Sequence, residues 1–232
     1  MLANHHDLDD AALARAAQQD PWVLYLIARR EKMTAAPSLD DLLAAAATAT
    51  VSLLSDPRAS GEWAEAIDQW QSISFRKVAL KARASRWEQI SELPGVTAAV
   101  GAAEVRAVVP VLRSERAAVL GKAQAMLDEL EDAALDDRPI SSAVRVLWLS
   151  PHAQMTSGKA MAQVGHCAQM LNTRLPETSR AAWAAAGFPV SVRRTGASDW
   201  SHLLERNDII AVRDAGLTEV DPGTYTVAAL VD

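Results

Sequence analysis

An aromatic pattern occurs twice in this chain at one constant spacing. Each copy contains a Trp, a Phe and a further Trp, and the second copy lies 113 residues after the first without a gap. The matched residues include both Phe residues of the chain: Trp70, Phe75 and Trp87 in the first copy, and Trp183, Phe188 and Trp200 in the second. A period this long is that of a whole folding unit, so the 232 residues are predicted to form two related lobes. The alternative is a chance match of aromatic core positions.

Hydrophobic patterning predicts the same kinds of elements in both lobes. Short β-rich runs such as VLYLIAR, VRVLWLS, VSVRR, DIIAVRD and YTVAALV alternate with Ala-rich helical stretches. This alternation predicts the α/β class, with two sandwich lobes that each hold a small mixed sheet flanked by helices. We expect the first lobe over residues 1–112, a helix and an acidic linker over 113–142, and the second lobe over 143–232. The run Val23–Leu26 echoes Val146–Leu149, at a slightly different offset from the aromatic repeat.

Composition narrows the class of function. A net charge of -6 argues against a generic nucleic-acid binder, although the part from Ala143 onward has as many basic as acidic residues. Basic side chains gather over Arg76–Arg83 and Val192–Arg194, where they would contact phosphates or form a solvated strand edge. The repeated aromatic residues are expected in the core rather than stacked on bases.

The single cysteine and the lack of a long apolar run bear on location. One cysteine, Cys167, excludes an intrachain disulfide and is interpreted as a buried structural thiol. The start of the chain shows no basic, apolar leader pattern, and the longest apolar stretch, Leu42–Leu54, is too short to cross a bilayer. We therefore expect a cytoplasmic protein that does not engage a membrane.

The stretch from Met155 to Leu171 combines a packing face with side chains capable of chemistry. Lys159, Gln163 and His166 stand at helical spacing on one face, while an apolar stripe runs beside them at Ala160, Val164, Cys167 and Leu171. Thr156 or Ser157 would cap this helix, so that Lys159 lies in the first turn, where unpaired amides favour anions. An amphipathic surface helix without a function is the other interpretation.

A second cluster near the C-terminus completes a pattern that resembles the peptidyl-tRNA hydrolase 2 family. The matching motifs are Gly158-Lys159, Ala162-Gln163 and His166 on the helix, followed by Asp214-Ala215-Gly216, Thr218 and Gly223 before a last strand. The resemblance covers Ser142 to Asp232. Leu217 stands where the family commonly has Arg, and the Gly-Pro tail common after the last strand is missing.

The resemblance implies a site and an activity. Lys159, His166, Asp214 and Thr218 would be catalytic, and the substrate would be bound by Gly158, Gln163, Ala215, Gly216 and Gly223. The reaction would be hydrolysis of the ester that joins a peptide, or a blocked amino acid, to the ribose of tRNA. In this interpretation Lys159 binds the terminal phosphate or the oxyanion, His166 accepts a proton or orients water, and Asp214 aligns that water.

No covalent nucleophile, cofactor or metal is needed for this chemistry, and the three later histidines lack partners at metal-ligand spacing. Peptidyl-tRNA is the expected partner. A non-catalytic module that binds tRNA or protein on the same fold remains an alternative, as does a hydrolase of another small ester or amide.

The first lobe resembles a copy without the catalytic residues. Its helix near Asp40 to Leu54 offers Leu, Ala and Thr where the second lobe has Lys159, Gln163 and His166, and Gly101 replaces Asp214. Members of the family commonly form homodimers, so the first lobe is predicted to take the place of the partner in an intrachain pseudodimer. The sequence leaves further assembly open.

Overall fold

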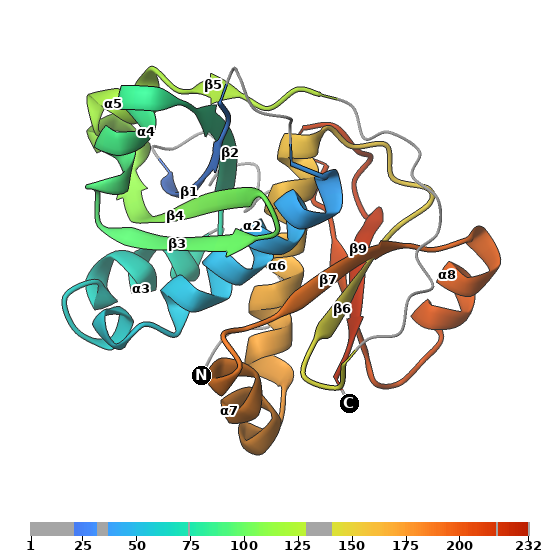
Figure 1. Cartoon of the computed structure of the whole chain (residues 1–232). Coiled ribbons are helices and arrows are strands. Elements are labelled where there is room, and N and C mark those ends of the chain that lie inside the picture. The colour runs from blue at the N-terminus through green and yellow to red at the C-terminus, as the bar shows by residue number, and fades with distance from the viewer. Residues whose placement is uncertain (1–20, 32–36, 74, 129–140, 217, 232) are drawn as a thin grey trace.

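The computed structural model describes residues 21–31, 37–73, 75–128, 141–216 and 218–231, and it confirms the α/β class. Two mixed sheets have helices around and between them (Figure 1). The first half of the chain forms β1 (Trp22–Arg29), α2 (Leu39–Leu54), η2 (Pro57–Ser60), α3 (Ala64–Ile73), β2 (Lys77–Ala82), α4 (Ala84–Ser91), β3 (Gly95–Val100), β4 (Ala103–Leu112), η3 (Arg113–Glu115), α5 (Ala118–Gly121) and β5 (Gln124–Ala125). The second half forms β6 (Arg145–Leu149), α6 (Ser157–Arg174), α7 (Glu177–Ala185), β7 (Val190–Arg194), α8 (Ala197–Leu204), β8 (Ile209–Arg213) and β9 (Tyr225–Leu230).

The two sheets share one topology. The first has the strand order β3-β4-β1-β2-β5, and the second, read in the matching direction, has β8-β9-β6-β7. In each sheet the first two strands of the lobe, β1 with β2 and β6 with β7, are parallel, and the remaining equivalent pairs are antiparallel. The internal repeat seen in the sequence is therefore a repeat of strand order and direction as well.

The repeated aromatic residues build the same local structure twice. In each lobe a Trp and a Phe meet edge to face, with ring centroids 5.7 Å apart for Trp70–Phe75 and 5.1 Å apart for Trp183–Phe188. Both Phe residues adopt a positive φ, 46° and 56°, which is rare for a bulky residue. The indole N–H donates to the backbone carbonyl of Arg76 in one lobe and of Pro189 in the other. A shared strained turn makes a chance match a poor explanation of the repeat.

The register of the strands differs from the echo expected between the first strands. Leu26 pairs with Ala79 and Leu147 pairs with Val192, and these two partners are 113 residues apart. Leu147 therefore corresponds to Leu26 and not, as the echo predicts, to Leu24. Both assignments keep the side chain on the same face of the strand, because they differ by two residues. The further echo at Met33-Thr34 falls outside the described residues.

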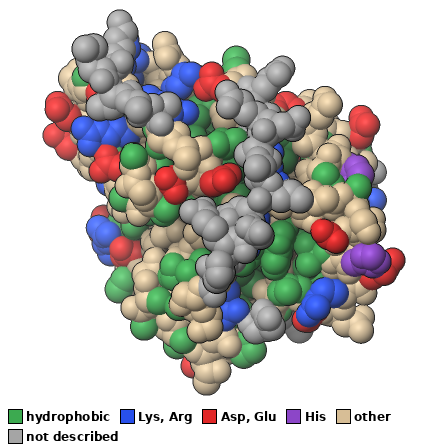
Figure 2. Space-filling model, turned by 45° about the vertical axis from the view of Figure 1, so that its right-hand side comes forward, with side chains coloured by type: hydrophobic (Ala, Val, Ile, Leu, Met, Phe, Trp, Pro, Cys, Tyr) green, Lys and Arg blue, Asp and Glu red, His purple; other side chains and the backbone are tan. Residues whose placement is uncertain are grey.

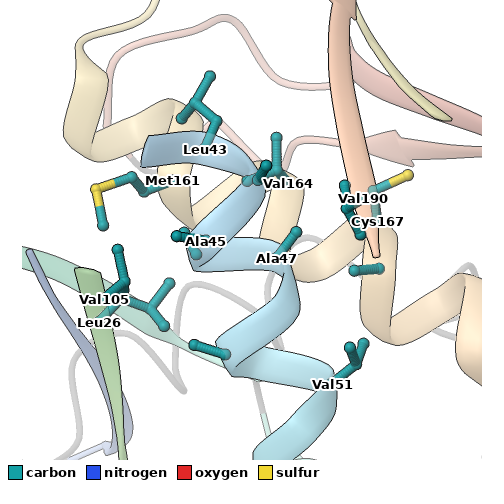
Figure 3. Close-up of a cluster of buried hydrophobic side chains, with 14 of the residues drawn as sticks. Leu26, Leu43, Ala45, Ala47, Val51, Val105, Met161, Val164, Cys167 and Val190 are labelled. Carbon is teal, nitrogen blue, oxygen red and sulfur yellow. The ribbon is translucent and has the colours of Figure 1, made fainter. Parts of the chain in front are cut away.

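The helices α2 and α6 form a central layer between the two sheets, and each contacts the sheet of the other lobe. Helix α2 packs on β3 and β4 of its own lobe and on β7 of the second, while α6 packs on β8 and β9 of its own lobe and on β2 of the first. Such a reciprocal pattern is that of two subunits related by a two-fold axis. Figure 3 shows the result, a single apolar core in which Leu26 and Val105 of the first sheet and Val190 of the second flank the same helices.

The helix expected at the start of the segment 113–142 is mostly absent from the described part of the chain. A four-residue helix, α5, is followed by β5, which pairs with the outer edge of β2. An edge strand satisfies β2 backbone groups that a continuing helix would leave open to solvent. Leu120 of α5 lies in a second apolar cluster, on the outer face of the first sheet. Residues 113–125 thus belong with the first lobe, and most of the expected acidic linker falls outside the described residues.

No helix in the described part of the chain is both long and apolar enough to cross a membrane.

Candidate active site at the start of α6

Helix α6 begins with a side-chain cap that a distant loop reinforces. Thr156 is the N-cap residue, and its hydroxyl accepts a hydrogen bond of 3.2 Å from the backbone N–H of Lys159. The carboxylate of Glu219 in turn accepts from the N–H of Thr156 at 2.7 Å and from its hydroxyl at 2.9 Å. These bonds fix the loop after β8 against the first turn of α6.

This anchoring brings together three of the four residues predicted to be catalytic. The ammonium Nζ of Lys159 donates to Oδ2 of Asp214 at 2.5 Å and to the hydroxyl of Thr218 at 3.1 Å. Gln163, one turn further along α6, donates from Nε2 to the same carboxylate oxygen at 2.9 Å. Residues more than fifty positions apart in the chain therefore form one polar cluster at the end of β8.

A further set of contacts orients the members of this cluster. Thr226, the second residue of β9, donates from its hydroxyl to Oε1 of Gln163 at 2.6 Å. This bond fixes the amide of Gln163 with Nε2 toward Asp214. The other oxygen of Asp214, Oδ1, accepts from the N–H of Gly216 at 2.8 Å. Gly216 has a φ of 74°, and a Cβ there would lie 2.4 Å from the ring of Pro222. A glycine is thus required for the turn that holds Asp214.

The other predicted substrate-binding residues have mainly backbone roles. Gly223 donates its N–H to the carbonyl of Asp214 at 2.7 Å, closing the loop. Ala215 is exposed beside the cluster. Leu217, in the position where the family commonly has Arg, lies outside the described residues. Thr156, Glu219 and Thr226 were not predicted as site residues. A threonine at the start of a predicted helix is a capping signal, but the sequence does not indicate which loop would reach it.

The cluster is largely removed from solvent. The side chains of Lys159 and Asp214 are 10% and 7% exposed, and Gln163 and Thr226 are buried. Thr218 and Glu219 are exposed, so the cluster opens to solvent on the side of the loop. Two carboxylates bond to this end of α6: Asp214 pairs with the Lys159 ammonium, and Glu219 bonds to Thr156.

The expectation of free amides at the start of α6 is wrong. The N–H of Ser157 donates to the carbonyl of Asp128 at 2.7 Å, and that of Gly158 donates to the carbonyl of Met126 at 3.2 Å. These carbonyls come from the segment that follows β5 of the first lobe, and they occupy the donors that would otherwise attract an anion. A Cβ on Gly158 would lie 2.5 Å from the Met126 oxygen, so this glycine permits the close approach of another backbone.

His166 does not join the cluster, contrary to the prediction. It lies two turns beyond Lys159, about 10 Å along the helix axis, and its Nδ1 is 3.1 Å from Nζ of Lys77 in the first lobe. Lys77 also donates to Oε1 of Gln169 at 2.7 Å, and its ammonium lies 4.7 Å from the centre of the Trp70 ring. Helical spacing places His166 on the same face of α6 as Lys159. The half of this face that holds His166 packs on β2 of the first lobe, so it forms a contact between the lobes.

Burial dominates the chemistry of this second polar group. Lys77 is buried, and desolvation holds its pKa well below the usual range of a lysine. The other face of α6 is apolar as predicted, with Ala160, Val164, Cys167 and Leu171 all inaccessible to solvent. Burial also raises the pKa of the Cys167 thiol, which agrees with its interpretation as a structural residue.

The equivalent corner of the first lobe differs from the expectation at one position, that of Lys159. The caps of the two helices, Ser38 and Thr156, correspond, so Lys159 is matched by Asp41 and not by an apolar residue or Thr. Gly101, which replaces Asp214, lies against Asp41, and a Cβ on Gly101 would be 2.4 Å from the Asp41 carboxylate. Where the second lobe pairs an ammonium with a carboxylate, the first has a carboxylate beside a bare backbone.

One hollow of the surface lies elsewhere, on the outer face of the second sheet. Val144, Val146, Trp148 and Leu230 are among the residues that line it. Figure 2, which turns that side of the molecule forward, shows hydrophobic side chains gathered there. The residues that line this hollow do not include any member of the polar cluster.

No group of three or more metal-binding side chains occurs among the described residues. Comparison of the chain with protein-family models, with curated proteins and with solved structures gave no match.

Proposed function

We propose that the second lobe is a hydrolase of peptidyl-tRNA, which cleaves the ester between a peptide or blocked amino acid and the ribose of tRNA. The observation that carries this proposal is the cluster of Lys159, Asp214 and Thr218. It joins the two motifs on which the resemblance to the peptidyl-tRNA hydrolase 2 family depends. The support of Asp214 by Gln163 and Gly216 adds two further residues of the same motifs.

Lys159 would stabilise the charge that develops on the ester carbonyl. Two of its N–H groups are directed to Asp214 and Thr218, which leaves the third for the oxyanion of the tetrahedral intermediate. The ammonium is already oriented by these partners, so little reorganisation is needed when the charge forms. Electrostatic stabilisation of this kind is often the largest single contribution to catalysis.

Asp214, rather than His166, would handle the proton. Water attacks the carbonyl carbon, its oxygen forms the new bond, and the bond to the ribose oxygen breaks. The proton lost by water passes through the Asp214 carboxylate to the departing ribose oxygen, so that a free peptide and an intact tRNA result. Thr218, which accepts from Lys159, can direct its own O–H toward the substrate or the water.

A binding module without turnover is the second candidate, and one observation favours it. Carbonyls of Met126 and Asp128 occupy the donors at the start of α6, and Lys159 is neutralised by Asp214. In that case tRNA would be held by the fold without cleavage of its ester.

Release of tRNA from an N-blocked aminoacyl-tRNA distinguishes the two functions. The purified protein should release free tRNA, and Lys159→Met should slow release about 100- to 1000-fold, the usual loss for one oxyanion donor. Tight binding without release would support the module instead. His166→Asn serves as the control, because its Nδ1 lies 3.1 Å from Nζ of Lys77, two helical turns beyond Lys159. A loss of release equal to that of Lys159→Met in this variant would restore His166 to the mechanism.

A cytoplasmic location is part of the proposal, since peptidyl-tRNA arises during translation and the single buried thiol needs no oxidising compartment.

A further inference from the structure

Arg194, the last residue of β7, has a guanidinium group that the chain does not satisfy. Its Nε and Nη2 atoms are buried, and the structure shows no hydrogen-bond partner for either of them. Buried donors without acceptors are costly, and more so when they carry a charge. A guanidinium with two N–H-bearing atoms that lack an acceptor is suited to hold a planar or tetrahedral oxyanion.

The first lobe satisfies the equivalent cation from within the chain. The residue that corresponds to Arg194 is Lys81, and its ammonium lies 3.4 Å from the carboxylate of Asp128. The next helix of that lobe, α4, also meets a carboxylate, because the N–H of Ala84 donates to Glu31 at 3.5 Å. Two acidic groups therefore complete this corner of the first lobe.

Neither acidic group has a described counterpart in the second lobe. Helix α8, which begins three residues after Arg194, has Gly196 as its N-cap and no side-chain cap. Continuing the strand register places His152 where Glu31 stands in the first lobe. The first turn of α8 has its own carboxylate, Asp199, whose Oδ2 would lie 3.9 Å from a Cβ on Gly196, whereas Nε and Nη2 of Arg194 have no hydrogen-bond partner.

The location of Arg194 relates it to the candidate active site. Strands β6, β7 and β8 run in the same direction, since β6 and β8 are both antiparallel to β9 and β7 is parallel to β6. Their ends share one edge of the sheet, and Asp214 follows β8 at that edge. Three strand spacings separate β7 from β8, about 14 Å.

We propose that Arg194 binds a backbone phosphate of the single-stranded 3′ end of tRNA, while the ester lies at Lys159 and Asp214. This assignment rests on the proposed function, and it names the part of the substrate that the second lobe recognises. The shared chemistry is that of a phosphate group, which free phosphate would also supply. The span of about 14 Å leaves room for the terminal nucleotide between the two points of contact.

Binding of a short single-stranded RNA that ends in CCA tests this subsite. The fluorescence anisotropy of the labelled RNA is measured over a series of KCl concentrations for the whole protein and for Arg194→Met, with inorganic phosphate as a competitor. Loss of one phosphate contact should weaken binding about tenfold at low salt and reduce the slope of log K against log[salt] by about 0.7. Arg194→Lys should restore most of the slope, which separates a lost charge from a lost fold.

The matched control is Lys81→Met, which removes the equivalent cation of the first lobe and should change neither affinity nor slope. Unchanged affinity and slope in Arg194→Met would overturn the proposal. Displacement of the labelled RNA from the wild type by inorganic phosphate as readily as by unlabelled RNA would also overturn it, because the site would then take any free anion.

The two proposals fail in different ways. If RNA binding depends on Arg194 but the wild-type protein releases no tRNA from the ester, the subsite stands and the hydrolase does not. If release occurs and Arg194→Met leaves its KM unchanged, the hydrolase stands and the subsite does not. The subsite predicts a raised KM with little change in kcat, because the contact is present in both ground and transition states.

Discussion

The start of α2 and the start of α6 occupy equivalent places in the two lobes, and they differ in charge. At α6, Lys159 pairs with Asp214 at the end of β8, whereas at α2 Asp41 faces Gly101 at the end of β3. The strands, caps and aromatic turns around both places are otherwise alike. Asp41 and Gly101 therefore stand where the second lobe has the pair of Lys159 and Asp214, and Ala45 stands at the position of Gln163.

In the contact between the lobes, the polar sheet residue belongs to the first lobe and not to the second. Lys77 of the first sheet meets His166 and Gln169 of α6. At the equivalent place in the second sheet stands Val190, and the residues of α2 that correspond to His166 and Gln169 are Thr48 and Val51. The first lobe thus lacks the polar corner of the second lobe, but it contributes the lysine of the polar contact with α6.

The largest expected difference between the lobes is in catalysis. Lys159→Met should slow ester hydrolysis about 100- to 1000-fold, whereas Asp41→Asn, at the equivalent position, should leave the rate unchanged. Initial rates of tRNA release measure both. Equal losses in the two variants would mean that the first lobe contributes to the reaction.

Introducing the missing carboxylate should expose the charge difference directly. Gly101→Asp places an anion against Asp41 at a φ of 53°, and we expect a loss of about 1–3 kcal/mol in the free energy of unfolding. Combination with Asp41→Lys should recover at least half of that loss by rebuilding the pair of the second lobe. Gly101→Asn is the control for backbone strain without charge. Urea denaturation measures all four proteins, and the absence of recovery would show that the corners are not equivalent.

The buried side chain of Lys77 should make stability depend on pH. The pKa of Lys77 is lowered in the folded state, so the unfolded chain binds more protons between that lowered value and about 10.5. This contribution to stability is therefore lost as pH falls and regained as pH rises, with a slope of at most on the order of 1 kcal/mol per pH unit. Urea midpoints between pH 7 and 8 should rise in the wild type, below the range in which the Cys167 thiol, whose pKa is raised in the folded state, would ionise in the unfolded chain.

Replacement of Lys77 by Met should flatten that rise. Lys81→Met, on the same strand but more exposed, should retain it. An unchanged slope in the Lys77→Met variant would locate the linked proton elsewhere.

The smallest expected effect concerns a single hydrogen bond between the lobes. The hydroxyl of Thr48 donates to the carbonyl of Phe188 at 3.0 Å in a buried contact, so Thr48→Val should cost about 1 kcal/mol. Thr50, also buried on α2, bonds only within its own helix, to the carbonyl of Ala46. Thr50→Val should therefore cost less, and thermal unfolding would reveal the reverse order if the bond across the lobes were unimportant.

The sequence predicts what short-range patterns determine. Strand runs, the cap at Thr156, the buried Cys167 and the aromatic repeat are all visible as local signals, and each has the expected place in the fold. The association of Lys159 with Asp214 also follows, because a motif match carries information about distant contacts that periodicity lacks.

What could not be predicted depends on packing between elements. Helical spacing gives His166 the same face as Lys159 but not the neighbour that covers it, and Lys77 comes from the other lobe. The carbonyls of Met126 and Asp128 that occupy the start of α6 arrive through the main chain, for which side-chain patterns give no signal. The contact of Glu219 with Thr156 likewise depends on how the loop after β8 closes.

The reciprocal seating of α2 and α6 has a consequence for substitutions in the first half. Ala45 and Ala47 are inaccessible to solvent where α2 lies between the sheets, so a larger side chain at either position would displace α6 and with it Lys159. A substitution in the first half can therefore disturb the polar cluster of the second half without contacting it. Genes shortened to residues 143–232 should encode fragments that aggregate, or that recover a neighbour by pairing with themselves.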